Sequence, residues 1–267
     1  MPTVTIDNIQ VEVEQGATIL DAADKAGVWI PTLCFHPAVE PQAACRICMV
    51  ELDRGEWKQL VTACNYPVRK DITVSVSSEN AVKARRGVME FLLARSPDNE
   101  PLKAIAQRMG VDSTPWPTVT VAQRDCILCG LCTSVCDEIL GLASVGFADR
   151  GVERAVAAPF RQAPDNCIAC GACAAVCPVG TIQVRIHEES DEIEISPFKA
   201  RAKLQKCEKC GARVDSVLTI EQALKSVKVN WSKIRDVAKI CPECRRAHTA
   251  ESLAATAPGK STTPRRR

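Results

Sequence analysis

Two runs of cysteines decide the fold of this chain: Cys126-Ile-Leu-Cys129-Gly-Leu-Cys132-Thr-Ser-Val-Cys136 and Cys167-Ile-Ala-Cys170-Gly-Ala-Cys173-Ala-Ala-Val-Cys177. Both have the spacing C-x2-C-x2-C-x3-C, which is typical of chains that bind a cubane [4Fe–4S] cluster. The alternatives are a disulfide framework, which is rare in the cytosol, and zinc, which does not need two separate runs of four cysteines. The doubled spacing therefore predicts two cubanes, and two clusters in one small domain indicate electron transfer.

The fourth cysteine of each run is expected to bind the cluster of the other run, as it does in two-cluster ferredoxins. The predicted ligands of the first cubane are Cys126, Cys129, Cys132 and Cys177. The predicted ligands of the second are Cys136, Cys167, Cys170 and Cys173. Gly130 and Gly171 let the backbone approach each inorganic core and can take positive φ. Asp137 stands where the second run has Pro178, a difference that removes no ligand.

The N-terminal segment predicts a separate small domain. The expected elements are strands over 3–6 and 9–14, a helix within 16–27, and strands over 48–53 and 72–76. The first two strands alternate apolar residues on either side of Asp7-Asn8, which is a hairpin signal. Gly27 is expected to end the helix. This order of elements is typical of a β-grasp ferredoxin.

Four cysteines in that domain suit a [2Fe–2S] cluster, which needs two thiolates on each iron. The predicted ligands are Cys34, Cys45, Cys48 and Cys64. Plant-type ferredoxins space theirs C-x4-C-x2-C…C, whereas the first gap here is ten residues. The alternative is structural zinc with His36 as a ligand. His36 lies between Phe35 and Pro37, which favours a loop residue, and four cysteines already suffice.

Composition bounds the remaining possibilities. The chain has 267 residues, 16 cysteines and only 4% aromatic residues, so metal centres are expected to carry part of the folding free energy. A net charge of +2 shows no large excess of basic residues of the kind that binds nucleic acid. The N-terminus has no apolar signal-peptide region and no apolar run approaches 18 residues. We therefore expect a cytoplasmic protein without a membrane span.

The C-terminal third carries two C-x2-C pairs that can share one metal. Their cysteines are Cys207, Cys210, Cys241 and Cys244. Zinc is the first choice for such a set of four sulfurs, and a third [4Fe–4S] cluster is the alternative. Gly211 is expected to take positive φ in the first knuckle turn. Helices are expected within 219–225 and 232–239, a solvated acidic surface over 188–194, and a disordered tail over 257–267.

Two segments carry a resemblance to known families. The stretch Ile30-Pro-Thr-Leu-Cys34…Cys45-Arg-Ile-Cys48-Met-Val-Glu51…Cys64 resembles the N-terminal ferredoxin domain of the large iron–sulfur subunit of respiratory complex I. It equally resembles the diaphorase small subunit of NAD-linked [NiFe] hydrogenases, and related subunits of formate dehydrogenases and [FeFe] hydrogenases. The stretch from Cys126 to Gly180 resembles their dicluster domain. The resemblance covers roughly residues 1–185 and implies an iron–sulfur electron-transfer subunit.

One feature of those relatives is missing. Their connecting helical segment carries a cluster bound by one histidine and three cysteines, whereas residues 79–118 contain neither residue type. Val88, Met89, Leu92 and Leu93 still predict a helix that stops at Pro97, followed by a second helix with Pro101 in its first turn. The missing cluster leaves open how the [2Fe–2S] and cubane sites connect.

The predicted fold class is α+β, in five parts. They are a β-grasp [2Fe–2S] domain over 1–78, a helical linker over 79–118, a bacterial-type dicluster [4Fe–4S] domain over 119–187, a small metal-knuckle domain over 199–250, and the tail. The chain has no G-x-G-x-x-G after a strand and no P-loop. It is therefore expected to need two partners, a flavin-containing NAD(P)H-linked subunit and a catalytic oxidoreductase subunit.

Three classes of catalytic partner suit such a chain: a hydrogenase, a formate dehydrogenase or a heterodisulfide-reductase-like subunit. An alternative is a succinate-dehydrogenase-type iron–sulfur subunit, which the ten-residue gap and the dicluster spacing fit less well. A second alternative is a zinc and iron–sulfur regulator of nucleic acid, supported only by the knuckles, Arg245-Arg246 and the three arginines at 265–267.

Overall fold

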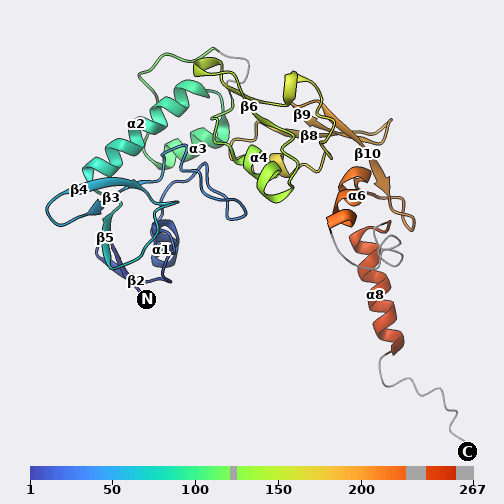
Figure 1. The fold of residues 1–267 in the computed structure, drawn as a ribbon, viewed down its shortest axis with the longest axis horizontal. Helices are drawn as coiled ribbons and strands as arrows, with labels where there is room; N and C mark the ends of the chain where they lie inside the picture. The colour runs from blue at the N-terminus through green and yellow to red at the C-terminus, as the bar shows by residue number, and fades with distance from the viewer. Residues whose placement is uncertain (121–124, 227–238, 257–267) are drawn as a thin grey trace, which may run out of the picture. The chain divides into compact units, whose positions relative to one another are not determined.

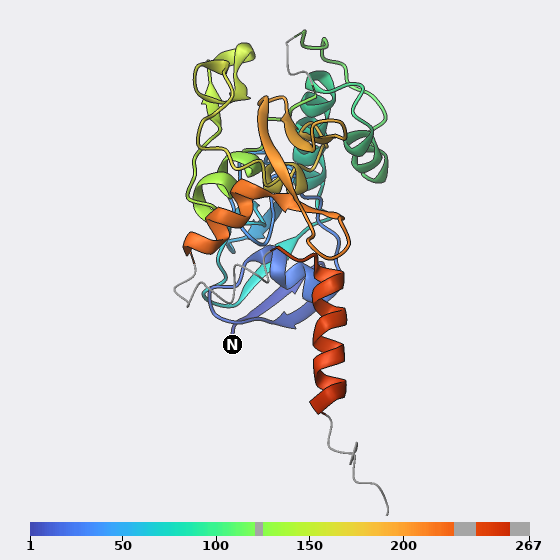
Figure 2. The same ribbon diagram turned by 90° about the vertical axis from the view of Figure 1, so that its right-hand side faces the viewer.

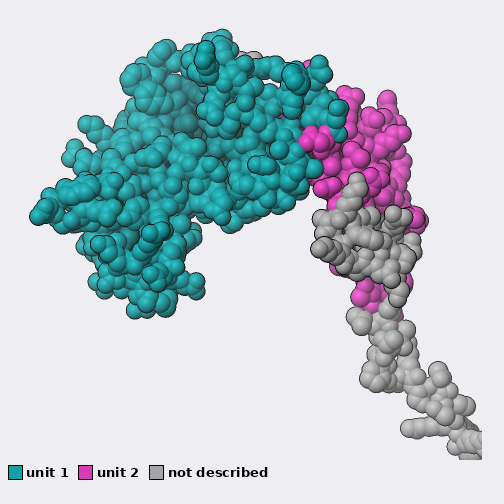
Figure 3. All heavy atoms as spheres, in the orientation of Figure 1, with its two compact units in different colours: residues 1–165, 171–183 teal, residues 166–170, 184–267 magenta. Residues whose placement is uncertain are grey.

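The structure is a computed structural model that describes residues 1–120, 125–226 and 239–256 (Figure 1). The predicted tail and most of the helix expected within 232–239 lie outside these residues. The chain divides into two compact units (Figure 3). Unit 1 comprises residues 1–165 and 171–183, and unit 2 comprises residues 166–170 and 184–267.

A five-stranded sheet forms the N-terminal part of unit 1. Its strands are β1 (Thr3–Ile6), β2 (Ile9–Glu12), β3 (Met49–Asp53), β4 (Lys58–Thr62) and β5 (Ile72–Ser75). The order across the sheet is β2-β1-β5-β3-β4, with β1 and β5 parallel and the other pairs antiparallel. Asp7 and Asn8 join β1 to β2 with φ of 43° and 74°, the signature of a two-residue hairpin turn. The hairpin and the strands expected near 48–53 and 72–76 are therefore present, whereas β4 was not predicted.

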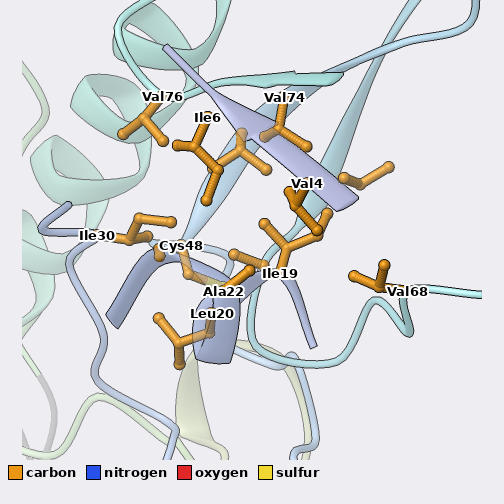
Figure 4. Close-up of a cluster of buried hydrophobic side chains, with 14 of the residues drawn as sticks. Val4, Ile6, Ile19, Leu20, Ala22, Ile30, Cys48, Val68, Val74 and Val76 are labelled. Carbon is orange, nitrogen blue, oxygen red and sulfur yellow. The ribbon is translucent and has the colours of Figure 1, made fainter. Parts of the chain in front are cut away.

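Helix α1 (Ile19–Ala26) packs on this sheet and closes its core (Figure 4). Thr18 and Asp21 form a reciprocal capping box, in which Asp21 N donates to Thr18 Oγ1 and Thr18 N donates to Asp21 Oδ2. Gly27 ends the helix at φ 70°, as predicted. Among the fully buried side chains are Ile6 and Ile19. Burial of one such side chain stabilises the fold by about 1.5–3 kcal/mol.

Two helices follow the sheet. Helix α2 (Glu79–Arg95) is capped by Ser78 and ends before Pro97, and α3 (Glu100–Arg108) is capped by Asn99, whose side chain accepts from Leu102 N. The predicted apolar stripe of α2 buries Met89 and Leu93. The segment after α3 packs back on α2, because Trp116 stacks on Phe91 of α2 with ring centroids 4.8 Å apart.

The rest of unit 1 holds short elements around the cysteine runs. They are α4 (Leu131–Ser134), the π-helical turn η1 (Val135–Ile139), the hairpin of β6 (Gly146–Ala148) with β7 (Ala155–Ala157), the turns η2 (Gly151–Glu153) and η3 (Pro159–Arg161), and α5 (Ala172–Ala175). Helices α4 and α5 begin directly after Gly130 and Gly171 and contain the third cysteine of each run, Cys132 and Cys173, which is consistent with a polypeptide that wraps its backbone around a compact group.

Unit 2 is built on a four-stranded antiparallel sheet of order β11-β10-β9-β8 (Figure 2). Its strands are β8 (Gln183–His187, whose first residue belongs to unit 1), β9 (Glu192–Ser196), β10 (Ala200–Lys206) and β11 (Arg213–Ser216). Helix α6 (Val217–Ser226) confirms the helix expected within 219–225, and α8 (Pro242–Thr256) follows the second knuckle. The acidic stretch over 188–194, predicted to be a solvated surface, enters β9 in its second half, where the largely buried Glu194 side chain pairs with Arg201 at 2.6 Å.

Arg85 joins helix α2 to the N-terminal sheet. It is 8% exposed, and its guanidinium donates to the Met49 carbonyl at 2.8 Å and to the Val76 carbonyl at 2.7 Å. Desolvation lowers the pKa of Arg85 from its ordinary value. The two carbonyls it reaches lie at the start of β3 and just after β5, so one side chain fixes the helix to two strands.

We predict that Arg85→Met lowers the free energy of unfolding by about 2–4 kcal/mol, because two buried carbonyls lose a charged donor. Thermal unfolding of the full chain followed by circular dichroism measures the effect. Arg86→Met is the matched control on the next residue, where an exposed pair with Glu90 contributes at most about 0.5 kcal/mol. Equal losses in the two variants would contradict the anchoring role of Arg85.

Candidate iron–sulfur and metal sites

The four N-terminal cysteines gather beside the ends of β3 and β4. Cys48 directly precedes β3, and Cys64 follows β4 by two residues. The antiparallel register brings these positions together, since Met49 lies opposite Thr62 and Ala63 N donates to the Cys48 carbonyl at 3.0 Å. The other two sulfurs come from the loop that leads into β3, where Cys45 N donates to Cys34 Sγ at 3.3 Å.

The four sulfurs interact as two pairs. A side-chain hydrogen bond from Cys45 lowers the pKa of Cys34 to about 6, and the same bond raises the pKa of Cys45. In the second pair, a side-chain hydrogen bond from Cys64 lowers the pKa of Cys48 to about 7 and raises that of Cys64. Two neighbouring pairs of sulfurs match what a rhombic cluster with two irons requires.

The backbone of this loop is bent at a residue that sequence reasoning did not single out. Arg46, between Cys45 and Cys48, has φ of 62°, a region that non-glycine residues rarely occupy. Such a conformation costs about 1–3 kcal/mol and persists where the surrounding structure requires it. It redirects the peptide groups next to the cysteines, and no residue preference in the sequence indicates it.

The two central runs adopt the same local conformation. In the first, Leu128 and Gly130 have φ of 56° and 85°; in the second, the equivalent Ala169 and Gly171 have φ of 52° and 75°. The predicted positive φ of both glycines is therefore confirmed, and the residue two places earlier shares it. In the first run this bend lets Leu128 N donate to Cys126 Sγ at 3.4 Å. The repeat in sequence is thus a repeat in backbone geometry.

Cys177 of the second run lies near the first run. Burial is the main cause that raises the pKa of the Cys129 thiol to about 11, and the neighbouring sulfurs of Cys177 and Cys126 contribute to this rise. Burial also raises the pKa of Cys132, with contributions from Cys129, Cys126, Cys173 and Cys177. Four sulfurs so placed repel one another as thiolates, and a positively charged iron core would remove that repulsion.

The loop of the [2Fe–2S] site and the loop of the first central run share one hydrophobic core. Leu33 and Cys34 belong to the same buried cluster as Cys129 and Leu131, together with Met89 of α2. Cys34 is close enough to Cys129 to add to the rise in its pKa. A polar contact crosses the same boundary, where Glu40 N donates to Glu138 Oε2 at 3.0 Å.

Asn99 fastens the second run to the helical segment. Its amide Nδ2 donates to the Val179 carbonyl at 2.7 Å, two residues beyond Cys177, while its Oδ1 caps α3. Asn99 is 8% exposed, so this bond is shielded from water. The segment of α2 and α3, which has no cluster ligand of its own, therefore helps to position Cys177.

The predicted ligands of the second cubane belong to different units of the chain. Cys136 and Cys173 belong to unit 1, whereas Cys167 and Cys170 belong to the segment 166–170 of unit 2. That segment is held by the start of α6. The hydroxyls of Ser216 and Thr219 both donate to the Ile168 carbonyl, at 2.5 and 3.1 Å.

The C-terminal cysteines form a tight group. The sulfurs of Cys207, Cys210, Cys241 and Cys244 all lie within 4.8 Å of one another, and Cys210 Sγ is 3.7 Å from Cys241 Sγ. Cys241 N donates to Cys207 Sγ at 3.2 Å, and this bond is the main reason that the pKa of Cys207 falls to about 6. Gly211 takes φ of 73°, as predicted for the knuckle turn.

Two protein families match this chain. Residues 1–79 match the 2Fe-2S iron-sulfur cluster binding domain, and residues 122–181 match the 4Fe-4S dicluster domain. The chain thus contains a 2Fe–2S and a 4Fe–4S ferredoxin-like domain with mixed α/β content. Unit 2 beyond residue 181 lies outside both matches. In the described residues, no helix is long and apolar enough to cross a membrane.

Curated relatives are subunits of larger proteins. The NADPH-Fe(3+) oxidoreductase subunit alpha of Geobacter sulfurreducens is 34% identical over 57% of this chain and 20% of its own length. The mitochondrial NADH-ubiquinone oxidoreductase 78 kDa subunit of Candida albicans is 31% identical over 55% of this chain and 24% of its own length. The corresponding 78 kDa protein of Neurospora crassa is 30% identical over 55% and 23%. The chain therefore spans less than a third of each of these relatives.

A solved structure shares the fold. A chain of the NAD+-reducing [NiFe]-hydrogenase in its H2-reduced state superimposes with a TM-score of 0.50 and 24% identity, over 75% of this chain and 86% of its own. This similarity shows a shared fold. The resemblance expected from the cysteine motifs is found in the relatives that match by sequence.

Proposed function

We propose that this chain, which joins a 2Fe–2S domain to a 4Fe–4S dicluster domain, is an electron-transfer subunit of a multi-subunit NAD(P)H-linked oxidoreductase. When bound, the clusters supply reversible one-electron oxidation and reduction. The observation that carries the proposal is the core shared by the Cys34 loop and the Cys129 loop. Its apolar side chains exclude water between two cluster-binding loops and hold them in one folded unit.

The shared core also supports a proposal about how the sites connect without the histidine–cysteine cluster of the relatives. Residues 79–118 contain no ligand of that kind, yet Cys34 and Cys129 are near enough to influence each other electrostatically. The helices instead supply packing, through Met89 and Leu102, and an anchor, through Asn99. We therefore infer that the two loops need no intermediate site between them.

The proposed ligand sets follow the sulfurs and the spacing. The [2Fe–2S] site takes Cys34, Cys45, Cys48 and Cys64; the first cubane takes Cys126, Cys129, Cys132 and Cys177; the second takes Cys136, Cys167, Cys170 and Cys173. The pairing of the N-terminal sulfurs and the position of Cys177 support the first two sets. The third rests on the crossed spacing alone.

We further propose zinc, rather than a third cubane, at the C-terminal site. A Zn–S bond of about 2.3 Å puts the sulfurs of a regular tetrahedron about 3.8 Å apart. The observed separation of Cys210 Sγ and Cys241 Sγ is 3.7 Å, and all four sulfurs lie within 4.8 Å. A cubane places four irons between its thiolates and requires a wider spacing. Zinc would fold the knuckles of unit 2 without taking part in redox chemistry.

The proposed partners are a flavin-containing NAD(P)H-linked subunit on one side and a catalytic oxidoreductase subunit on the other, in the cytoplasm. Support comes from the relatives, whose names identify them as NADPH- or NADH-linked oxidoreductase subunits. A hydrogenase, a formate dehydrogenase and a heterodisulfide-reductase-like protein are the proposed classes of catalytic subunit.

The function is tested by anaerobic purification of the native complex. We expect about ten irons and one zinc per chain, and reduction of the clusters by NADH or NADPH only when the co-purifying flavin subunit is present. The isolated, cluster-loaded chain is the control, since it has no nucleotide site of its own to accept a hydride. Purification without any oxidoreductase subunit, or about six irons or fewer after full reconstitution, would contradict the proposal.

The crossed ligands are tested by a matched pair of substitutions. Cys177→Ala should remove the cubane whose other ligands are Cys126, Cys129 and Cys132, whereas Cys136→Ala should remove the other one. EPR of the two reduced variants distinguishes the signals that remain. If each substitution instead abolishes the cluster of its own run, the ligands are not crossed.

The zinc site is tested with Cys241→Ala. Zinc binding contributes strongly to the folding of small sulfur-ligated units, so we expect the loss of one zinc per chain and easier proteolysis of unit 2, with the [2Fe–2S] and first-cubane signals unchanged. Metal analysis and EPR on one sample measure both effects. A loss of four irons together with a reducible centre would show that the site is a third cubane.

A further inference from the structure

The chain folds back over Cys136, a predicted ligand of the second cubane. Cys136 lies in the π-helical turn η1, a type of turn that is frequent at functional sites. After this turn, Leu142 N and Ala143 N both donate to the Cys136 carbonyl, at 3.0 and 3.3 Å. Ala143 has φ of 48°, an unfavourable conformation for a residue with a side chain. The π-helical turn, the two hydrogen bonds to the Cys136 carbonyl and the positive φ of Ala143 together bring the segment after η1 against Cys136.

The next residue, Ser144, makes direct contact with the sulfur. Its backbone N–H donates to Cys136 Sγ at 3.3 Å. Ser144 is 1% exposed, so this hydrogen bond lies away from bulk water. A donor to a thiolate stabilises its negative charge, and a buried donor does so more strongly than an exposed one.

The hydroxyl of Ser144 is the unexplained part of this arrangement. Among the described residues, Ser144 Oγ is a buried side-chain oxygen that no protein donor or acceptor reaches. Leaving such a group unsatisfied costs about 1–3 kcal/mol. An alanine would avoid this cost and would preserve the backbone bond to Cys136. The hydroxyl therefore points to an acceptor that is not a protein atom and that lies beside the Cys136 sulfur.

We propose that Ser144 is a redox-tuning residue, whose hydroxyl donates a hydrogen bond to a sulfur of the cluster bound through Cys136. This inference rests on the proposed function, which places a cubane at Cys136. The acceptor is an inorganic sulfide of that cubane. Reduction adds one electron to the cluster and increases the negative charge on its sulfurs, so the hydrogen bond is stronger in the reduced state. Ser144 thus raises the reduction potential of this cubane, one of the known levers on such potentials.

The test is Ser144→Ala in the full, anaerobically loaded chain, with the midpoint potential of each cubane measured by EPR-monitored titration. We expect the equilibrium constant for reduction of the second cubane to fall about tenfold, which is about 59 mV for one electron, towards more negative potential. The iron content and the first cubane should not change. The Cys136→Ala variant identifies which EPR signal belongs to the second cubane.

Two further variants serve as controls. Ser144→Thr keeps a hydroxyl and should restore most of the potential. Ser134→Ala removes the hydroxyl of another buried serine, two residues before Cys136, whose oxygen is not among the unsatisfied buried groups of the described residues, and should leave both potentials unchanged. If Ser144→Ala does not assemble its cluster, Ser144→Gly, which also lacks the hydroxyl, takes its place. Pulsed EPR in D2O then compares the exchangeable deuterons coupled to the second cubane, and the native chain and Ser144→Thr should show one more than Ser144→Gly, because the backbone N–H of residue 144 contributes equally to all three.

The outcomes separate this inference from the function on which it rests. Unchanged potentials in a fully loaded Ser144→Ala or Ser144→Gly variant, a shift confined to the first cubane, or no coupled deuteron lost together with the hydroxyl would each overturn the role of Ser144 and leave the electron-transfer proposal standing. The absence of any cubane signal from the loaded native chain would overturn the proposed function instead.

Discussion

The rest of the structure depends on one constraint, which is that cysteine sulfurs lie close together in buried positions. Burial raises the pKa values of Cys126, Cys129 and Cys132, so these groups resist becoming thiolates unless a cation compensates the charge. Iron–sulfur cores and zinc provide that compensation, and their binding free energy becomes folding free energy. A chain with few aromatic residues can therefore fold around its metal centres rather than around one large hydrophobic core.

Local chemistry in the sequence was sufficient to predict the first hairpin, the end of α1 and the turns within the central cysteine runs. The alternation around Asp7-Asn8 indicated the first hairpin, and Gly27 indicated where α1 ends, because both signals act within a few residues. The positive φ of Gly130 and Gly171 followed from the need for a close backbone approach. The cysteine spacing itself carries the chemistry, since few other groups use that pattern twice.

Features made by long-range contacts could not be predicted in the same way. The sheet of unit 2 was missed because charged residues hide its pattern, although Ile193 and Ile195 do alternate inward in β9. The core shared by Leu33 and Leu131 joins residues far apart in sequence, and no local signal indicates it. Ser144 is an ordinary serine in the sequence. Its importance arises only from a backbone path that brings it beside Cys136.

The two hydrogen bonds from Ser216 and Thr219 to the Ile168 carbonyl affect the order in which the cluster-binding loops can fold. Ser216 and Thr219, which hold the loop carrying Cys167 and Cys170, leave the ribosome about fifty residues after that loop. All four N-terminal cysteines, in contrast, lie within the first 64 residues and pair with near neighbours in the chain. Cluster insertion can thus begin at the amino end while synthesis continues, whereas the loop over 166–170 reaches its final shape only after α6 has emerged. The cluster-binding loops therefore reach their final shape in order from the amino end to the carboxyl end of the chain.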